Sequence, residues 1–429
     1  ICCPSRSSIL TGLYTHNHKA FNNSYEGGCA GETWRNLEKQ TFGAYLHDSN
    51  YKTFYAGKYL NQYQADYVPE GWDWWIGLKE NSKYYNYDLS VNGTLHHFDE
   101  EYLPDLMTHH ALNFLDSING EQPFLMVLST PSPHSPSTPA PRHVGKFRNV
   151  TALRTATFNK HFEDKHWLLN MPPKILSETA IQELDRIYRT RWECLLAIDD
   201  MVEAVVEKLD NLKILDDTYI VYTSDNGYHI GQFAQAYDKR QPYETDIKVP
   251  LLIRGPGVQE KKLINTPVAN IDLAPTLLDM AGLEVPEHMD GLSFADVLIA
   301  NSNSNREAFN ERQILFQYWG EENPHTISEK CPEWHNDKHL ARCDPVVDCR
   351  CQDVGNNTYA CIRHIAKDIN LMFCQFNDNE NFQEMYDLYQ DPFEQNNIAY
   401  EILPAIRAKY INVIDHLKNC IGEECHKIY

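Results

Sequence analysis

Long hydrophobic runs are absent from this chain of 429 residues. A membrane-spanning helix needs about 18 to 20 consecutive apolar residues, and no run approaches that length, so we expect no membrane span. A charged and apolar leader of the secretory kind is missing as well. Because the sequence starts with Ile1 and not with Met, we expect it to be a truncated form.

Positive charge is scarce. Lys and Arg number 38 against 60 Asp and Glu, which gives a formal net charge of −22. Surfaces that bind nucleic acid carry an excess of basic side chains, so no nucleic-acid partner is expected. Full protonation of the 19 histidines would bring the formal charge from −22 to −3, as the pH falls through their usual pKa of about 6.5. That change would help a protein that meets polyanions in an acidic compartment.

The sequence has no recurrent C-x-x-C pair with the spacing of a structural zinc site. Cysteines are nevertheless numerous, 12 in all, and most lie late in the chain: Cys331, Cys343, Cys349, Cys351, Cys361, Cys374, Cys420 and Cys425. This clustering predicts disulfides formed in a secretory compartment, with zinc as the alternative. Four Asn-x-Ser/Thr sequons predict N-glycosylation in the same compartment: Asn22, Asn92, Asn149 and Asn356.

The hydrophobic pattern predicts an α/β fold. Three short apolar runs, at 123–129, 218–224 and 249–255, are typical of buried parallel strands. Residues 179–210 repeat apolar side chains at spacings of three and four, which predicts a long helix, and a further helix is expected to stop at Gly282. Strands that alternate with helices indicate a mostly parallel sheet flanked by helices.

The character of the chain changes after about residue 297, where the polar stretch ANSNSNREAFNE begins. Cysteine-rich strand candidates and a C-terminal helix follow, at 313–319, 359–364, 369–376 and 402–419. We therefore expect a catalytic domain over residues 1–297 and a smaller antiparallel α+β subdomain over residues 298–429.

Polar side chains follow the first two predicted strands. His134 comes after the first, and Asp225, Asn226 and His229 come after the second, while Lys239 precedes the third. Ligands of open parallel sheets bind beyond the carboxyl ends of the strands, so these groups are expected to converge on one crevice. The pair Asp225–Asn226 suits a hard cation, or forms an ordinary Asp-Asn-Gly turn bonded to local backbone.

The opening stretch ICCPSRSSILTG contains the pattern C-x-P-x-R. Chance would give roughly 0.02 such matches in a chain of this composition. The stretch resembles the signature of the sulfatase family, in which the first cysteine is oxidised to formylglycine during secretion. By that resemblance the modified residue is Cys2 and not Cys3, and the formylglycine-generating enzyme is a partner during maturation.

Longer motifs extend the resemblance over essentially the whole chain: TGLYTHNH, FYAGKYLNQY, NSKYYNYDLSVNG, TPSPHSP, YTSDNGYHIGQF, DKRQPYETDIKVPLLIRGPG and YDLYQDPFEQNNIA. Together they resemble the lysosomal N-acetylglucosamine-6-sulfatases and, less closely, the extracellular heparan endosulfatases. The resemblance implies an alkaline-phosphatase-like sulfatase fold, and hydrolysis of the 6-sulfate of N-acetylglucosamine 6-sulfate in heparan or keratan sulfate. It also implies a role in glycosaminoglycan degradation, in the lysosome or, alternatively, as a secreted protein.

The same resemblance implies one calcium ion per chain, held by Asp225, Asn226 and the modified Cys2. Sulfatases of this type add two neighbouring aspartates from the end of an amino-terminal strand that precedes the cysteine. No such strand precedes Cys2 in this sequence. We therefore expect the N-terminal strand to be missing from the sheet and the cation site to be incomplete, because calcium takes about 6 to 8 oxygen ligands.

The resemblance assigns the remaining catalytic roles residue by residue. Arg6 orients the hydrated aldehyde made from Cys2, and Lys58 and Lys239 neutralise charge on the transferring group. His134 is the general acid for the departing sugar oxygen. Taken one at a time, each of these residues has an ordinary structural alternative as a surface, loop or packing residue.

Three further histidines, His16, His18 and His229, are candidate contacts to the sugar or the sulfate. Many sulfatases also carry a histidine two residues after the pocket lysine. Here Lys58 is followed by Tyr59 and Leu60, so that role, if filled, falls to Asn61 or His16.

Three other functions stay open from the sequence. An extracellular heparan sulfate 6-O-endosulfatase would carry a long basic insertion, and no such charge run exists here. A phosphodiesterase of the same wider fold would use Thr or Ser in place of the cysteine. A chain without its amino-terminal strand could also be an inactive sulfatase-like fragment.

Overall fold

The computed structural model describes residues 1–429 except 121, 300–305 and 323–324. Its largest sheet has five strands in the order β4-β3-β2-β1-β5. The strands are β1 (Lys52–Lys58), β2 (Trp74–Leu78), β3 (Tyr87–Val91), β4 (Thr94–Phe98) and β5 (Phe124–Ser129). β1 pairs in parallel with β2 and β5, whereas β2–β3 and β3–β4 are antiparallel. The sheet is therefore mixed.

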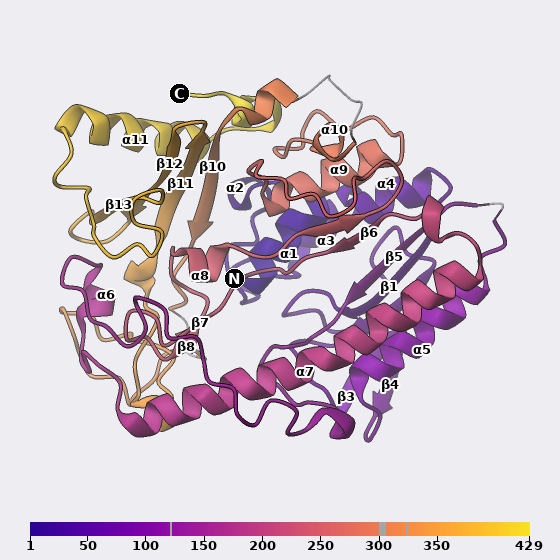
Figure 1. The fold of residues 1–429 in the computed structure, drawn as a ribbon, viewed down its shortest axis with the longest axis horizontal. Coiled ribbons are helices and arrows are strands. Elements are labelled where there is room, and N and C mark those ends of the chain that lie inside the picture. Colours follow the sequence, from indigo (N-terminus) through magenta and orange to yellow (C-terminus); the bar gives the residue numbers. More distant parts are fainter. Residues whose placement is uncertain (121, 300–305, 323–324) are drawn as a thin grey trace.

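Helices cover both faces of this sheet (Figure 1). α5 (Leu103–Asp116) and α7 (Glu178–Asn211) pack on one face and enclose one hydrophobic cluster. α1 (Cys2–Thr11), α4 (Phe42–Asp48) and α9 (Leu273–Met280) pack on the other. These two layers confirm the predicted α/β class.

Short helices lie along the whole chain. The short α-helices are α2 (Thr15–His18), α3 (Glu32–Leu37), α6 (Trp167–Asn170), α8 (Glu244–Ile247) and α10 (Ala295–Leu298). The 3-10 helices are η1 (Glu38–Gln40), η2 (Pro141–His143), η3 (Leu215–Asp217), η4 (Asn270–Asp272), η5 (Arg306–Phe309), η6 (Pro345–Val347), η7 (Gly355–Asn357) and η8 (Gly422–His426). Among the described residues, no helix is long and apolar enough to cross a membrane.

The predicted long helix is confirmed as α7, which begins after Ser177. The Ser177 side chain accepts a hydrogen bond from the backbone N–H of Ala180, and this satisfies one of the unpaired donors of the first turn. Buried side chains recur along one face, including Leu184, Ala197 and Val205, as the apolar spacing predicts. Tertiary packing along this stripe stabilises a helix of 34 residues.

The prediction of three buried parallel strands is wrong for two of them. β6 (Ile220–Tyr222) and β9 (Leu252–Arg254) pair with each other in an antiparallel two-stranded sheet, and Leu252 is 59% exposed. A second pair, β7 (His229–Ile230) and β8 (Tyr237–Asp238), lies between them in sequence. An apolar run indicates a hydrophobic strand, but it does not determine which strand it pairs with or whether the pairing is parallel or antiparallel.

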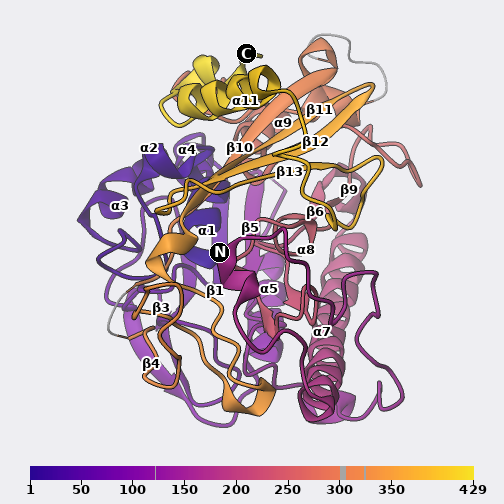
Figure 2. The ribbon, with the colours of Figure 1, turned by 90° about the vertical axis from the view of Figure 1, so that its left-hand side faces the viewer.

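The C-terminal part forms a separate antiparallel sheet in the order β10-β11-β12-β13. Its elements are β10 (Glu311–Tyr318), β11 (Tyr359–Ala366), β12 (Ile369–Phe376), β13 (Gln383–Asp387) and helix α11 (Pro404–Leu417). Figures 1 and 2 show them gathered at one end of the molecule, and the N-terminus lies near the middle of both views. The strand and helix predictions for this region are confirmed, whereas the domain division at residue 297 stays a prediction.

The predicted disulfides are also confirmed. The bonded pairs are Cys3–Cys29, Cys331–Cys351, Cys343–Cys349, Cys361–Cys374 and Cys420–Cys425. Cys2 and Cys194 carry free, buried thiols. The zinc alternative finds no support, because no group of three or more metal-ligating His, Cys, Asp or Glu side chains gathers within the described residues.

Gly57 lets β1 and β5 approach each other just before Lys58. Its φ is +102°, and a Cβ added there would lie 2.2 Å from the backbone oxygen of Ser129. We expect Gly57→Ala to lower the free energy of unfolding by more than the roughly 1–3 kcal/mol of a left-handed backbone alone. Gly282→Ala is the control, because Gly282 has a φ of +75° and nothing within 4 Å of its added Cβ. Equal losses in chemical denaturation would show that the close approach does not matter.

Candidate active site

Cys2 is the first residue of α1, where the backbone N–H groups and the helix dipole favour negative charge. Its side chain is 1% exposed, and Lys239 Nζ donates a hydrogen bond to its Sγ at 3.0 Å. Burial raises the pKa of the Cys2 thiol, but the positive charges of Lys239 and Lys58 outweigh burial and hold that pKa well below its ordinary value. Cys3 is bonded to Cys29, so the two adjacent cysteines have different fates.

Arg6 lies one turn further along α1 and joins three segments. Its Nε donates to Asp225 Oδ2 at 2.7 Å, and its Nη1 donates to the Lys58 carbonyl oxygen at 2.9 Å and to Ser129 Oγ at 2.6 Å. Burial opposes the charge of Arg6, but Asp225 raises the pKa of Arg6 above its ordinary value. The side chain therefore links the carboxyl ends of β1 and β5 to the turn after β6.

Lys58 is the last residue of β1 and is 1% exposed. Burial lowers the pKa of its ammonium group to about 8; Cys2 opposes this shift, while the nearby Arg6 and Lys239 add to it. Its Nζ donates to Asn81 Oδ1 at 3.1 Å. The sequence did not indicate Asn81, because no apolar run predicted β2, the strand that precedes this residue.

His134 lies in the loop after β5. Its Nδ1 is 2.7 Å from the carbonyl oxygen of Ser135, which can only accept, so Nδ1 carries a proton and Nε2 is the nitrogen free to serve the site. Burial lowers the pKa of His134, and the charge of Lys239 lowers it further. A hydrogen bond with Cys2 opposes both effects, and the net result leaves the pKa of His134 below its ordinary value.

Asp225 and Asn226 form the turn after β6. Burial would raise the pKa of Asp225, but Arg6, Lys239 and Lys58 hold it well below its ordinary range, so the carboxylate is ionised. Asn226 Nδ2 donates to the Gly227 carbonyl oxygen at 2.8 Å, as in an ordinary turn. Asn226 Oδ1, however, is buried and has no hydrogen-bond partner among the described residues.

This orphaned acceptor tests whether the turn fits a divalent cation. Asn226 Oδ1 and the ionised Asp225 carboxylate are hard oxygen donors of the kind that calcium prefers. Calcium takes about 6 to 8 such ligands, and no cluster of three or more His, Cys, Asp or Glu side chains surrounds the pair within the described chain. The two residues therefore fit part of a calcium site.

These groups line one cavity of about 2100 Å³, which includes Arg6, Lys58, His134, Asp225, Asn226 and Lys239 in its wall. Cys2 lies behind the wall, in contact with Lys239. The cavity continues between β5 and β6, which share no ladder, along an apolar surface that includes Val127, Ile198 and Ile220. The crevice expected at the carboxyl ends of the strands is therefore present.

Three predicted substrate contacts lie outside this wall. His16 has both ring nitrogens paired, with Gln317 Oε1 at 3.1 Å and the Cys420 carbonyl oxygen at 3.0 Å. His18 is buried against Ser8, and burial lowers its pKa to about 3. His229 is buried between Asp246 and Gln352. The structure brings none of the three to the cavity, because each pairs with other protein groups.

Asn61, the other candidate for the position after the pocket lysine, does line the cavity. It is 7% exposed, and its Oδ1 has no hydrogen-bond partner among the described residues. An amide at this position can contact a ligand oxygen or nitrogen without carrying a charge.

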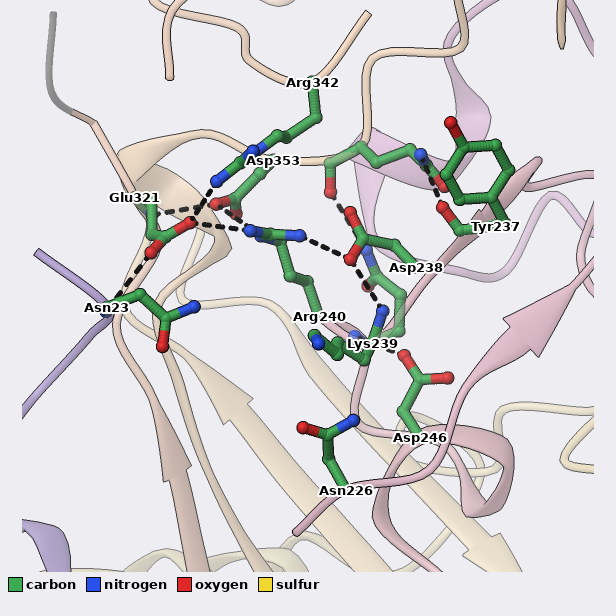
Figure 3. Close-up of polar contacts among 12 residues, drawn as sticks. Asn23, Asn226, Tyr237, Asp238, Lys239, Arg240, Asp246, Glu321, Arg342 and Asp353 are labelled. Atoms are coloured by element: carbon green, nitrogen blue, oxygen red, sulfur yellow. Dashed lines mark hydrogen bonds and ion pairs between the residues drawn. The ribbon is translucent and has the colours of Figure 1, made fainter. Parts of the chain in front are cut away.

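A buried ion-pair network flanks Lys239 (Figure 3). Arg240 contacts Asp238 on one side and, on the other, Glu321 at 2.7 Å and Asp353 at 3.4 Å. Arg342 adds a second cation at 3.1 Å from Glu321. Local sequence motifs could not reveal this network. Glu321, Arg342 and Asp353 follow Arg240 by 81 or more residues, and only the fold brings them together.

The four sequons differ in their surroundings. Asn92 and Asn149 are exposed, whereas Asn22 and Asn356 are partly buried. Asn356 Nδ2, the atom that would carry a glycan, donates a hydrogen bond to Asp337 Oδ2 at 3.1 Å. Glycosylation at the four positions stays a prediction.

The comparisons with known proteins agree with this geometry. The family model described as Sulfatase matches residues 1–283. The N-acetylglucosamine-6-sulfatase of Homo sapiens is 44% identical over 438 residues, which cover 99% of this chain and 78% of that protein. The N-acetylglucosamine-6-sulfatase of Capra hircus is 45% identical over 438 residues, covering 99% of this chain and 77% of that protein.

More distant relatives share less. The extracellular sulfatase SULF-1 homolog of Drosophila melanogaster is 40% identical over 339 residues, which cover 77% of this chain and 30% of that protein. Among solved structures, a protein in complex with its substrate D-glucosamine-2-N,6-O-disulfate superimposes with a TM-score of 0.75 at 22% identity, covering 99% of this chain and 88% of that one. At that identity the likeness shows the fold alone.

The network of Figure 3 predicts a pH-dependent stability. Burial raises the pKa of Asp353 to about 7, with Arg240 opposing and Glu321 adding to the shift, whereas an unfolded Asp has a pKa of about 3.9. The stability contributed by its protonation is therefore full below about pH 4 and is lost as the pH rises through about 7. Asp353→Asn should remove that loss, so the variant should gain roughly 2–4 kcal/mol on the wild type between pH 5 and pH 8.

The measurement is urea unfolding of both proteins across this pH range. Asp368→Asn, at an exposed turn between β11 and β12, is the matched control and should follow the wild type. A difference between Asp353→Asn and the wild type that does not change with pH would contradict the prediction.

Proposed function

The chain belongs to the sulfatase family of sulfuric ester hydrolases, and we propose that it hydrolyses the 6-sulfate ester of N-acetylglucosamine 6-sulfate in heparan sulfate and keratan sulfate. The identity of 44–45% over 99% of the chain to proteins named N-acetylglucosamine-6-sulfatase supports this substrate. The enzyme would act in glycosaminoglycan degradation.

One observation carries the proposal. Cys2 has an acidic thiol at a helix N-terminus, and Lys239 contacts it from the cavity wall that also holds Arg6, Lys58, His134 and Asp225. A nucleophile, cations for an anionic group and a general acid are the parts that sulfuryl transfer needs. They meet here from segments more than two hundred residues apart.

In the first step, the residue made from Cys2 acts as a hydrated aldehyde. One hydroxyl gives its proton to water as its oxygen attacks the sulfur atom and forms a new S–O bond, and the bond between sulfur and the sugar oxygen breaks. His134 Nε2 gives its proton to the departing sugar oxygen. Lys58 and Lys239 neutralise the charge of the transferring group, and Arg6 orients the diol.

In the second step, the sulfated residue releases its product. The remaining hydroxyl gives its proton to water, the C=O bond reforms, and the C–O bond to the sulfate breaks, so sulfate leaves and the aldehyde is restored. Addition of water to the aldehyde regenerates the diol. A thiol could not do this, because a sulfated thiol has no second hydroxyl to expel the group. This difference is the physical reason for converting Cys2, which in our proposal the formylglycine-generating enzyme does during maturation.

A calcium ion, one per chain, completes the proposed site. Asp225, Asn226 and the oxygen of the modified Cys2 would hold it. When bound, it would polarise the sulfate oxygens and lower the pKa of the attacking hydroxyl. The orphaned Asn226 Oδ1 supports this assignment.

We further propose that the enzyme acts on terminal sugars in the lysosome, which it reaches by the secretory pathway. The sequence has no long basic run of the kind that would hold an extended polyanion. An acidic compartment suits His134, because burial lowers its pKa and the general acid must be protonated before it reacts. The disulfides suit the oxidising route.

Replacing the nucleophile tests the chemistry. Cys2→Ser should abolish multiple turnover, since Ser accepts a sulfo group but cannot expel it, and intact mass spectrometry should find one sulfo group trapped on the protein. The double variant Cys3→Ser/Cys29→Ser is the control: it loses a disulfide worth roughly 2–4 kcal/mol of stability but keeps turnover. Full multiple-turnover activity of Cys2→Ser would contradict the proposed mechanism.

Product mapping tests the substrate. Given a heparan oligosaccharide, the enzyme should release 6-sulfate from the non-reducing terminal glucosamine alone, and faster at acidic pH. Mass spectrometry of the products locates the lost group. Loss of internal 6-sulfates from intact chains would favour the endosulfatase, and no release from any sulfate ester would favour an inactive sulfatase-like chain.

A further inference from the structure

The two sides of the proposed site stand on different sheets. His134 follows β5, at the edge of the five-stranded sheet, and Asp225 and Asn226 follow β6, in the two-stranded sheet. Because no backbone ladder joins β5 to β6, side-chain contacts must fix the distance between the general acid and the anionic turn. Arg6 provides one such contact through Ser129 and Asp225.

A second bridge comes from α7. The guanidinium carbon of Arg191 lies 3.8 Å from the centre of the Tyr228 ring, and its Nη1 donates a hydrogen bond to the Pro133 carbonyl oxygen at 3.0 Å. Pro133 immediately precedes His134, and Tyr228 lies two residues after Asn226. One side chain therefore touches both loops of the site.

The contacts on either side make this bridge stiff. Tyr84 Oη donates to the His134 carbonyl oxygen at 2.8 Å, and Ser137 Oγ donates to the Pro133 carbonyl oxygen at 2.9 Å. On the other side, Tyr228 N–H donates to the Thr245 carbonyl oxygen at 2.7 Å. Loss of Arg191 would therefore remove one of the hydrogen bonds that hold the backbone beside the His134 ring, and the one that ties it to the Tyr228 side.

The charge of Arg191 is unusual for a structural contact. Among the described residues no carboxylate forms an ion pair with it, and burial lowers its pKa. The planar guanidinium stacks on an aromatic ring while an N–H reaches a carbonyl, a combination that the compact ammonium of Lys does not reproduce. Both features favour a geometric role.

We propose that Arg191 is a positioning residue, which sets the His134 ring against the Asp225–Asn226 turn so that proton transfer meets the departing oxygen. The inference rests on the proposed function, because it takes His134 as the general acid. Misplacing a catalytic group by about 1 Å can cost on the order of 100-fold in rate. The loss should fall on the step that needs the proton.

The test compares two sulfate esters with Arg191→Met. A glucosamine 6-sulfate oligosaccharide has a strongly basic leaving oxygen that needs protonation, whereas 4-nitrophenyl sulfate leaves as a weakly basic phenolate. Arg191→Met should lower kcat on the sugar ester roughly 10- to 100-fold with little change in KM, and should lower kcat on the aryl ester far less. Arg191→Lys, which keeps the charge without the stack, should also lose kcat on the sugar ester.

The matched control is Arg189→Met. Arg189 lies on the same helix and donates a hydrogen bond to the Val150 carbonyl oxygen at 3.2 Å, but it is not part of the cavity wall. It should leave both substrates unchanged. The melting temperature of each variant separates misplacement of His134 from loss of the fold.

The variant His134→Ala distinguishes the role proposed for His134, as general acid, from the role proposed for Arg191, as positioning residue. A general acid should give the same dependence on the leaving group, with a loss of roughly 100- to 10,000-fold on the sugar ester. The double variant His134→Ala/Arg191→Met should then be no slower than His134→Ala alone, because both substitutions remove the same function, protonation by His134.

Each contrary result has its own meaning. Equal losses on both esters for His134→Ala would overturn His134 as the acid and, with it, this inference. The expected behaviour of His134→Ala, combined with equal losses, a raised KM alone, or additive effects for Arg191→Met, would overturn only the role of Arg191.

Discussion

The guanidinium group of Arg6 is the contact on which the site depends. It is the only side chain described here whose hydrogen bonds reach the end of β1, the end of β5 and the turn after β6 at once. The partners are a carboxylate, a carbonyl and a hydroxyl, which match the fixed fork of N–H donors on Arg. Without this contact, the ends of β1 and β5 would lose their direct hydrogen-bonded link to the Asp225 carboxylate.

The second constraint is electrostatic. Lys58, Lys239 and Arg6 surround Cys2 and Asp225. Cys2 and Lys58 are buried, and the other three are partly buried. Burial of like charges is costly, and the lowered pKa of Lys58 records part of that cost. The same arrangement attracts an anionic sulfate ester, because a second anion would relieve the repulsion among the cations. Binding of a sulfate ester should therefore lower the electrostatic energy of the site.

The sequence predicted the helices and strands better than it predicted how they pair and pack. The period of α7 and the apolar runs of β5, β11 and β12 were sufficient, because burial of one face dictates the spacing of apolar residues. The rule for carboxyl ends placed His134, Asp225 and Asn226 together, and Lys239 joined them. The direction of β9, the burial of His18 and the pairing of His16 depend on segments distant in sequence, and no local pattern encodes them. Arg191 escaped for the same reason, since as one of several arginines on a long helix it differs from Arg189 only in what the fold brings beside it.

The contacts around Cys2 join residues that are far apart in sequence, and this has a consequence during synthesis of the chain. The hydrogen bond from Lys239 joins residues 237 positions apart. At synthesis rates of about 5–20 residues per second, on the order of 10–50 s pass between the emergence of Cys2 and that of Lys239. During this interval the thiol cannot be enclosed by the partner that later covers it. The maturation enzyme that we propose for Cys2 would thus have tens of seconds to reach a residue that the finished fold leaves 1% exposed.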